Sequence, residues 1–172
     1  MKTRLLGMAL LALLAGCVTF GPYGTADFEP TLRRDAPMVE GKIVHQVPGR
    51  LLYGIDGFNF VDNMAVKSPI FHGGRTESGI GLFVLTEDKV HFVVWRDEKY
   101  QHGWDLAYKQ IQSLEVRALG LGRRLVVKLD ADPGVTSFDI MSDDAQWVDA
   151  ARTASICRLL AERSGKECRL PA

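Results

Sequence analysis

Residues 79–95 read GIGLFVLTEDKVHFVVW, and this stretch decides the fold. Apolar residues alternate along one face on both sides of a polar break, at Ile80, Leu82, Val84, Val90, Phe92 and Val94. Two such runs separated by a few polar residues, here TEDK at 86–89, are typical of a β-hairpin. Phe83 and Leu85 point the opposite way, so both faces of the hairpin carry apolar side chains and one face could receive a partner.

Further strands are predicted on either side of this hairpin. Alternation over 113–117 and 125–129, with Gly120 and Gly122 between, predicts a second hairpin, and residues 136–140 predict another strand after the turn DPG. Less regular strands are expected at 42–47, 51–55 and 58–66, with turns at Pro48-Gly49 and Asp56-Gly57 and a polar loop at 74–79.

One long helix is expected to close the chain at about 143–163. Ser142 or Asp143 suits its N-cap, Asp143 and Gln146 have capping-box spacing, and Gly165 suits its end. The expected packing face consists of Trp147, Ala150, Ala151, Ala154 and Cys157.

The order of antiparallel strands followed by a capping helix resembles the pleckstrin-homology (PH) fold, especially GRAM and bacterial PH-like domains. The residues that carry the resemblance are GLFVLTEDKVHF at 81–92 and LAYKQIQSLEV at 106–116, and it extends over about 66–163. It implies a mainly β fold with a C-terminal helix (α+β), an antiparallel barrel or sandwich capped by that helix. Bacterial domains of this type mostly lack an assigned ligand, and fold alone does not carry function.

The N-terminus resembles the signal peptide of bacterial lipoproteins. Lys2 and Arg4 precede an uncharged apolar run at 5–15, which is too short to span a bilayer. The sequence LAGC at 14–17 resembles a lipobox, which implies lipidation of Cys17 after removal of residues 1–16. An ordinary secretory signal with a chance cysteine is the alternative.

The residue after the lipidated cysteine bears on location in such lipoproteins. Val18 stands where aspartate would favour retention in the inner membrane, so the resemblance implies the periplasmic face of the outer membrane. The cell surface and the inner membrane remain alternatives.

The mature chain divides into a tether and one domain. Three prolines and three glycines interrupt residues 18–41, so residues 17–41 are expected to form a flexible tether with a reach of about 27 Å. Phe20, Tyr23 and Phe28 could instead dock on a partner or on the domain itself. Residues 42–172 are expected to form a single PH-like domain.

The charge balance and the cysteines restrict the partners and the chemistry. The chain has 21 basic and 21 acidic residues, which argues against a nucleic-acid partner. In an oxidising compartment, Cys157 and Cys168 are predicted to form a disulfide that staples the tail to the closing helix. A buried inert Cys157 with a free Cys168, or a redox-active pair, are the alternatives.

No metal or cofactor is predicted. His45, His72, His91 and His102 show no ligand spacing, and His91 is expected to point outward from a strand. Four arginines next to predicted loops could contact a phosphate or carboxylate, although a solvated charged rim is the default, namely Arg75, Arg117, Arg123 and Arg124.

Three functions are weighed. No nucleophile elbow, phosphate-binding loop or zinc-protease motif occurs in the sequence. The preferred hypothesis is therefore a non-enzymatic binding or scaffold module of the cell envelope, attached to the membrane by its lipid and holding an envelope protein. A carrier or sensor of a lipid or small molecule is the alternative, and a cell-envelope hydrolase is a third.

Overall fold

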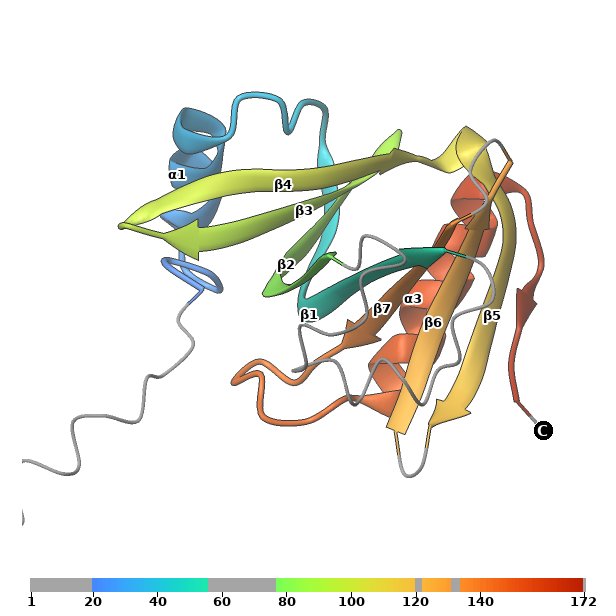
Figure 1. Cartoon of the computed structure of the whole chain (residues 1–172). Coiled ribbons are helices and arrows are strands. Elements are labelled where there is room, and N and C mark those ends of the chain that lie inside the picture. The colour runs from blue at the N-terminus through green and yellow to red at the C-terminus, as the bar shows by residue number, and fades with distance from the viewer. Residues whose placement is uncertain (1–19, 56–76, 120–121, 131–133, 172) are drawn as a thin grey trace, which may run out of the picture.

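The chain is mainly β with one long C-terminal helix, as predicted. The computed structural model describes residues 20–55, 77–119, 122–130 and 134–171. Its elements follow the PH-like order, seven antiparallel strands and then the helix (Figure 1). They are α1 (Phe28–Asp35), β1 (Ile43–Ile55), β2 (Glu77–Thr86), β3 (Lys89–Arg96), β4 (Lys99–Ala107), the 3-10 turn η2 (Tyr108–Gln110), β5 (Ile111–Leu119), β6 (Gly122–Leu129), β7 (Gly134–Ile140), α3 (Ala150–Ser164) and β8 (Cys168–Arg169).

The described strands form one bent sheet. Its order is β4-β3-β2-β1-β7-β6-β5-β8, antiparallel throughout except where β8 pairs with β5 in parallel. β1 pairs with β2 along one edge and with β7 along the other, so it joins the two halves of the sheet. In Figure 1 the β2–β4 half and the β5–β7 half lie at an angle, with α3 against the second half and α1 at the far end of β3 and β4.

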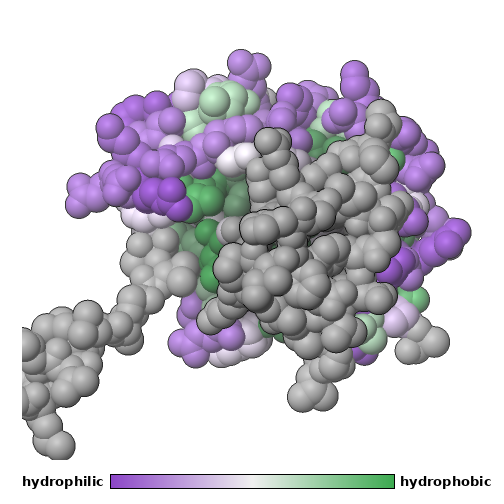
Figure 2. All heavy atoms as spheres, viewed as in Figure 1, coloured by the Kyte–Doolittle hydropathy of each residue, from purple (hydrophilic) through white to green (hydrophobic). Residues whose placement is uncertain are grey.

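The surface of the described residues is mostly polar. Hydrophilic side chains cover most of the described surface in the view of Figure 2. The large apolar side chains that remain exposed are few among the described residues: Met38, Trp147 and Leu170. No described helix combines the length and apolar composition needed to cross a bilayer.

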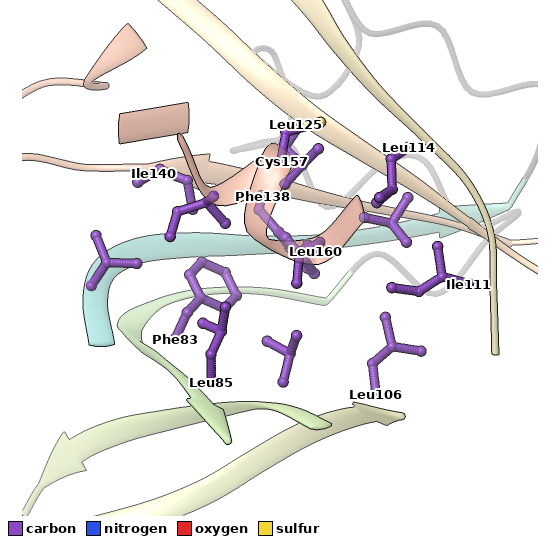
Figure 3. Close-up of a cluster of buried hydrophobic side chains, with 14 of the residues drawn as sticks. Phe83, Leu85, Leu106, Ile111, Leu114, Leu125, Phe138, Ile140, Cys157 and Leu160 are labelled. Atoms are coloured by element: carbon purple, nitrogen blue, oxygen red, sulfur yellow. The ribbon is translucent and has the colours of Figure 1, made fainter. Parts of the chain in front are cut away.

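The main core lies between the two halves of the sheet and α3. Figure 3 shows Phe83 and Leu85 of β2 facing the side chains of Phe138 and Leu160, which come from β7 and α3. The rings of Phe83 and Phe138 lie 4.6 Å apart between centroids. Large side chains thus fill the space between β2, β7 and α3.

Both predicted hairpins are confirmed, whereas the predicted turn at Pro48-Gly49 is wrong. β2 pairs with β3 and β5 pairs with β6, but β1 continues through Pro48 and Gly49. The carbonyl of Pro48 accepts a hydrogen bond from the Met141 amide at 2.9 Å. A Cβ on Gly49 would come within 2.4 Å of the Phe83 ring, so the glycine serves close packing rather than a turn. The turn expected at Asp56-Gly57, the strand expected at 58–66 and the loop residues 74–76 lie outside the described residues. Residues 77–79, expected in the same loop, instead begin strand β2, because they pair with β1.

The closing helix starts later than predicted, and its buried face shares only Cys157 with the predicted one. It begins at Ala150 with Asp149 as N-cap, because the carboxylate of Asp144 accepts hydrogen bonds from Ser142 Oγ and the Gln146 amide and folds the preceding residues into a turn. Trp147 is 58% exposed, and the buried residues of the helix are Thr153, Ile156, Cys157 and Leu160. The predicted end at Gly165 is confirmed, with φ of 68°.

The predicted disulfide is present. Cys157 of α3 is bonded to Cys168, with a Cα–Cα distance of 5.7 Å. Cys168 lies in β8 and pairs with Leu114 of β5. The bond therefore holds the C-terminal tail against both the helix and the edge of the sheet.

The expectation of a flexible tether over 17–41 needs correction, because residues 20–41 fold onto the domain. α1 buries Phe28 and Leu32, and these join Phe20, Ala36 and Val39 in a second core against the outer face of β2–β4. The Arg33 guanidinium donates hydrogen bonds to the carbonyl oxygens of Val39 and Gly41. The chain's own N-terminal segment, 20–41, covers the sheet face that could have received a partner. Its aromatic residues therefore dock on the domain itself, which was one of the alternatives considered from the sequence.

An aromatic row fixes this N-terminal segment. Phe20, Tyr23, Phe28 and Tyr100 of β4 meet in successive edge-to-face contacts, with ring centroids 5.6–6.2 Å apart. The Tyr100 hydroxyl donates a buried hydrogen bond of 2.6 Å to the carbonyl oxygen of Phe20. The chain is thus held to the sheet three residues after Cys17.

Candidate functional site

A polar cleft of about 340 Å³ lies where the N-terminal segment, β1, the turn before α3 and α3 itself meet. This volume falls within the range of small-ligand sites. The cleft is lined by Tyr23, His45, Gln46, Val47, Asp143, Arg152, Ser155 and Ile156. This cleft was not predicted from the sequence, because none of the segments that form it contains a recognisable motif.

Asp143 is the centre of the hydrogen-bond network in this cleft. Both terminal nitrogens of Arg152 donate to its carboxylate, at 2.7 and 2.8 Å, and the Tyr23 hydroxyl donates to it at 3.1 Å. Arg152 Nε also lies 3.4 Å from an oxygen of Asp149. The network joins the N-terminal segment to the start of α3, across 120 residues of sequence.

The surroundings fix the protonation states of the cleft at neutral pH. The hydrogen bond from Arg152 holds the pKa of Asp143 below its usual range, and burial together with Asp143 raises the pKa of Tyr23 to about 12. Partial burial and the charge of Arg152 lower the pKa of His45. The cleft therefore presents a matched charge pair, a neutral imidazole and a phenol.

This arrangement suits recognition of a neutral polar group better than of a net charge. Among the residues that line the cleft, Asp143 neutralises the positive charge of Arg152. His45, Gln46 and Ser155 bring donors and acceptors to the cleft. Ser155, His45 and Asp143 are the residue types of a hydrolase triad, yet within the described chain no hydrogen bond joins them. Asp143 is bound by Arg152 and Tyr23 instead, so a triad is not assembled here.

Three of the four arginines singled out from the sequence lie on the β5–β6 hairpin, where Arg117 pairs across the strands with Arg124, and none of the three lines the cleft. Arg124 is buried and donates two hydrogen bonds to Asp139, Arg117 pairs with Glu115 at 2.7 Å, and Arg123 donates to the Gly122 carbonyl oxygen. Arg75 and the lipidation candidate Cys17 lie outside the described residues, as does His72. The structure therefore places no cluster of the described loop arginines at the cleft.

His91 points away from the main core, as expected of an outward strand residue, but it is not exposed. Its side chain is buried, at 2% exposure, because the N-terminal segment covers that face of the sheet. The structure also brings it near His102, whereas the sequence offered no sign that any two histidines converge.

Comparison with known proteins yields only distant likenesses. No family model matches the chain, and no curated protein matches it. Among solved structures, human RhoA in complex with the DH/PH fragment of PDZRHOGEF is 14% identical, with 72% of this chain and 29% of that chain covered and a TM-score of 0.43. The DH/PH domains of p115-RhoGEF are 14% identical, with 83% of this chain and 36% of that chain covered and a TM-score of 0.45. Vav1 inhibited by an allosteric inhibitor is 10% identical, with 93% of this chain and 38% of that chain covered and a TM-score of 0.47.

These likenesses concern general shape alone. The chain spans only about a third of the length of the structures that it matches. At such TM-scores and identities they say nothing about the activity or partners of this chain. The fold class stands on the strand order and the capping helix described above.

Proposed function

We propose that this chain is a lipid-anchored, non-enzymatic binding module of a bacterial cell envelope, with the cleft around Asp143 as its recognition site. The lipobox resemblance at 14–17 supports the attachment, and Val18 supports the periplasmic face of the outer membrane. The compact β domain and its charge-matched polar cleft support binding rather than catalysis.

One observation carries the proposal: Phe20, three positions after the lipidation candidate Cys17, is bound to the domain that contains the cleft. Phe20 is 7% exposed and bound to the sheet, so only two residues separate it from Cys17. The three Cα–Cα steps from Cys17 to Phe20 span at most about 10 Å in an extended chain, and the six steps from Cys17 to Tyr23 span at most about 20 Å. Tyr23 lines the cleft, which would therefore work next to the membrane surface rather than on a long arm.

The attachment is tested by Cys17→Ser. Two or three acyl chains at Cys17 would hold the protein in the membrane fraction, because a single chain alone binds only marginally. We expect the variant to lose incorporation of labelled palmitate and to move to the soluble fraction of fractionated cells. The control is Cys168→Ser, which keeps the N-terminus intact and should stay with the membrane. A Cys17→Ser protein that remains in the membrane would contradict lipid anchoring.

Recognition by the cleft is tested by Ser155→Trp. Ser155 lies exposed on α3, so an indole there would occupy the cleft without disturbing the core. We expect proteins crosslinked to the wild type in intact envelopes, or a small ligand seen by native mass spectrometry, to be lost with Ser155→Trp. Arg158→Trp is the matched control, because Arg158 is exposed on the same helix and does not line the cleft. Equal recovery with both variants would overturn the assignment of the cleft.

A further inference from the structure

Two histidines from neighbouring strands face one another without the hydrogen bonds that buried imidazoles normally have. His91 of β3 is 2% exposed, and its ring centroid lies 5.7 Å from that of His102 in β4. The Nδ1 atom of His91 and the Nε2 atom of His102 are both buried, and neither has a hydrogen-bond partner among the described residues. Buried polar atoms are paired in the great majority of cases, so two orphaned nitrogens at one place call for an explanation.

A β-bulge in β4 creates this meeting. Trp104 pairs with Phe92 and His102 pairs with Val93, so Gly103 is the extra residue on β4. Without the bulge, His102 and Asp105 would lie on opposite faces of the strand, because side chains alternate. The bulge turns His102 to the face that carries His91 and Asp105, and bulges commonly re-aim a side chain at functional sites.

Asp105 supplies a third donor beside the two imidazoles. It pairs directly with His91 across the strands, and one ligand atom from each of the three residues lies within 4.8 Å of the others. His91 is buried, His102 is half-buried and Asp105 is exposed, so the group opens to solvent on the carboxylate side. Such a graded set leaves room for a water molecule as a further ligand.

We propose that His91, His102 and Asp105 form a binding site for a transition-metal ion of the zinc class. Two neutral imidazoles and one carboxylate are a ligand set that suits Zn²⁺ and Co²⁺, with a fourth position left to water. For tetrahedral zinc the donor atoms lie about 3.3 Å apart, given Zn–N distances of about 2.0–2.1 Å. The donor atoms must therefore close by up to about 1.5 Å around the ion, and rotation of the exposed Asp105 can supply the part that involves its carboxylate.

The charges around the group set the conditions for binding. Burial, with His102 nearby, lowers the pKa of His91 to about 4, so its ring is neutral and its lone pair is available at neutral pH. Lys89 Nζ lies 2.8 Å from Asp105 and is the resident cation of this carboxylate. The metal ion would displace that ammonium group, whose long side chain is 47% exposed and can turn to solvent.

The proposal is tested by titrating the purified full chain, prepared without a polyhistidine tag, with Zn²⁺ in a calorimeter. We expect one zinc ion per chain, and Co²⁺ should give the visible absorption of a tetrahedral site. Changing a residue that hydrogen-bonds to a metal ligand weakens metal binding about 10–100-fold. His102→Ala removes a ligand itself, so it should weaken zinc binding by about 100-fold or more. Asp105→Asn should weaken it by about tenfold.

His45→Ala is the matched control, since His45 lies on β1 in the cleft and belongs to no metal-ligating group that the structure describes. It should bind zinc within about twofold of the wild type, and circular dichroism checks that each variant is folded. His102 rather than His91 is replaced, because the buried His91 contributes to packing. A wild-type dissociation constant weaker than about 0.1 mM, or unchanged affinity in His102→Ala, would overturn the proposal.

Discussion

Asp139→Ala is expected to remove about 3–5 kcal/mol from the free energy of unfolding. Asp139 of β7 accepts two hydrogen bonds from Arg124 of β6, at 2.6 and 2.8 Å, and the two side chains are only 5% and 3% exposed. The variant would leave the guanidinium charge buried without this carboxylate. Removing one partner of a buried ion pair is among the largest single-residue penalties in a folded protein.

The expected loss is measured by urea unfolding of the purified protein, with the disulfide intact. Glu115→Ala is the matched control, because Glu115 pairs with Arg117 at a similar distance of 2.7 Å on a neighbouring strand, but both side chains are about 40% exposed. An exposed pair contributes about 0–1 kcal/mol. The double variant Arg124→Met/Asp139→Leu should recover most of the stability, because apolar residues of similar volume can replace a buried pair. Equal losses in Asp139→Ala and Glu115→Ala would contradict this account of Arg124.

The alternation of apolar and polar residues predicted those strands in which the pattern is unbroken. Where the pattern is interrupted, the prediction failed, and the reason can be identified in each case. β2–β3 and β5–β6 each show a long apolar face, so their pairing followed from residues such as Leu82 and Leu125. β4 was missed because its sequence, KYQHGWDLA, is polar and contains the bulge at Gly103. Its turn places Asp97 and Glu98 at positive φ, where asparagine and glycine are the usual signals.

The candidate sites could not be predicted, because each depends on contacts between distant segments. Tyr23 and Asp143 are 120 residues apart, and each is an ordinary polar residue in its own segment. His91 and His102 converge only through a bulge that has no clear sequence signature. Arg124 looked like a loop arginine beside a glycine-rich turn, whereas the register of β6 and β7 sets it against Asp139.

The sequence did contain one sign of the folded N-terminal segment. Both faces of the β2–β3 hairpin are apolar, which indicates a covering element on each side. One is the main core, and the other is the N-terminal segment, with Phe28 and Leu32 one helical turn apart on α1. An eight-residue helix with Pro30 in its first turn is too short for its apolar spacing to be recognised from the sequence alone. Its stability comes from the sheet that it covers.

Leu32→Ala is therefore expected to release the N-terminal segment. Leu32 is fully buried in the second core, and a buried leucine replaced by alanine loses about 2–5 kcal/mol. We expect α1 to unfold locally before the rest of the domain, because this short helix packs on the sheet through only one of its faces. Trypsin should then cleave after Arg33 and Arg34 at least about 30-fold faster, the factor that corresponds to about 2 kcal/mol. Amide exchange in β5–β7 should stay unchanged, since the segment packs on the other half of the sheet.

Met38→Ala is the matched control for this release, because Met38 lies in the same segment and is 52% exposed. A surface substitution of this kind changes stability by no more than about 0.5 kcal/mol, so cleavage after Arg33 should keep its wild-type rate. If Leu32→Ala also keeps that rate, the segment is held by contacts other than its apolar face. If instead the variant is cleaved rapidly and still binds at the cleft in envelopes, then Tyr23 is dispensable for recognition, and the short connection to the lipid serves only to hold the domain at the membrane.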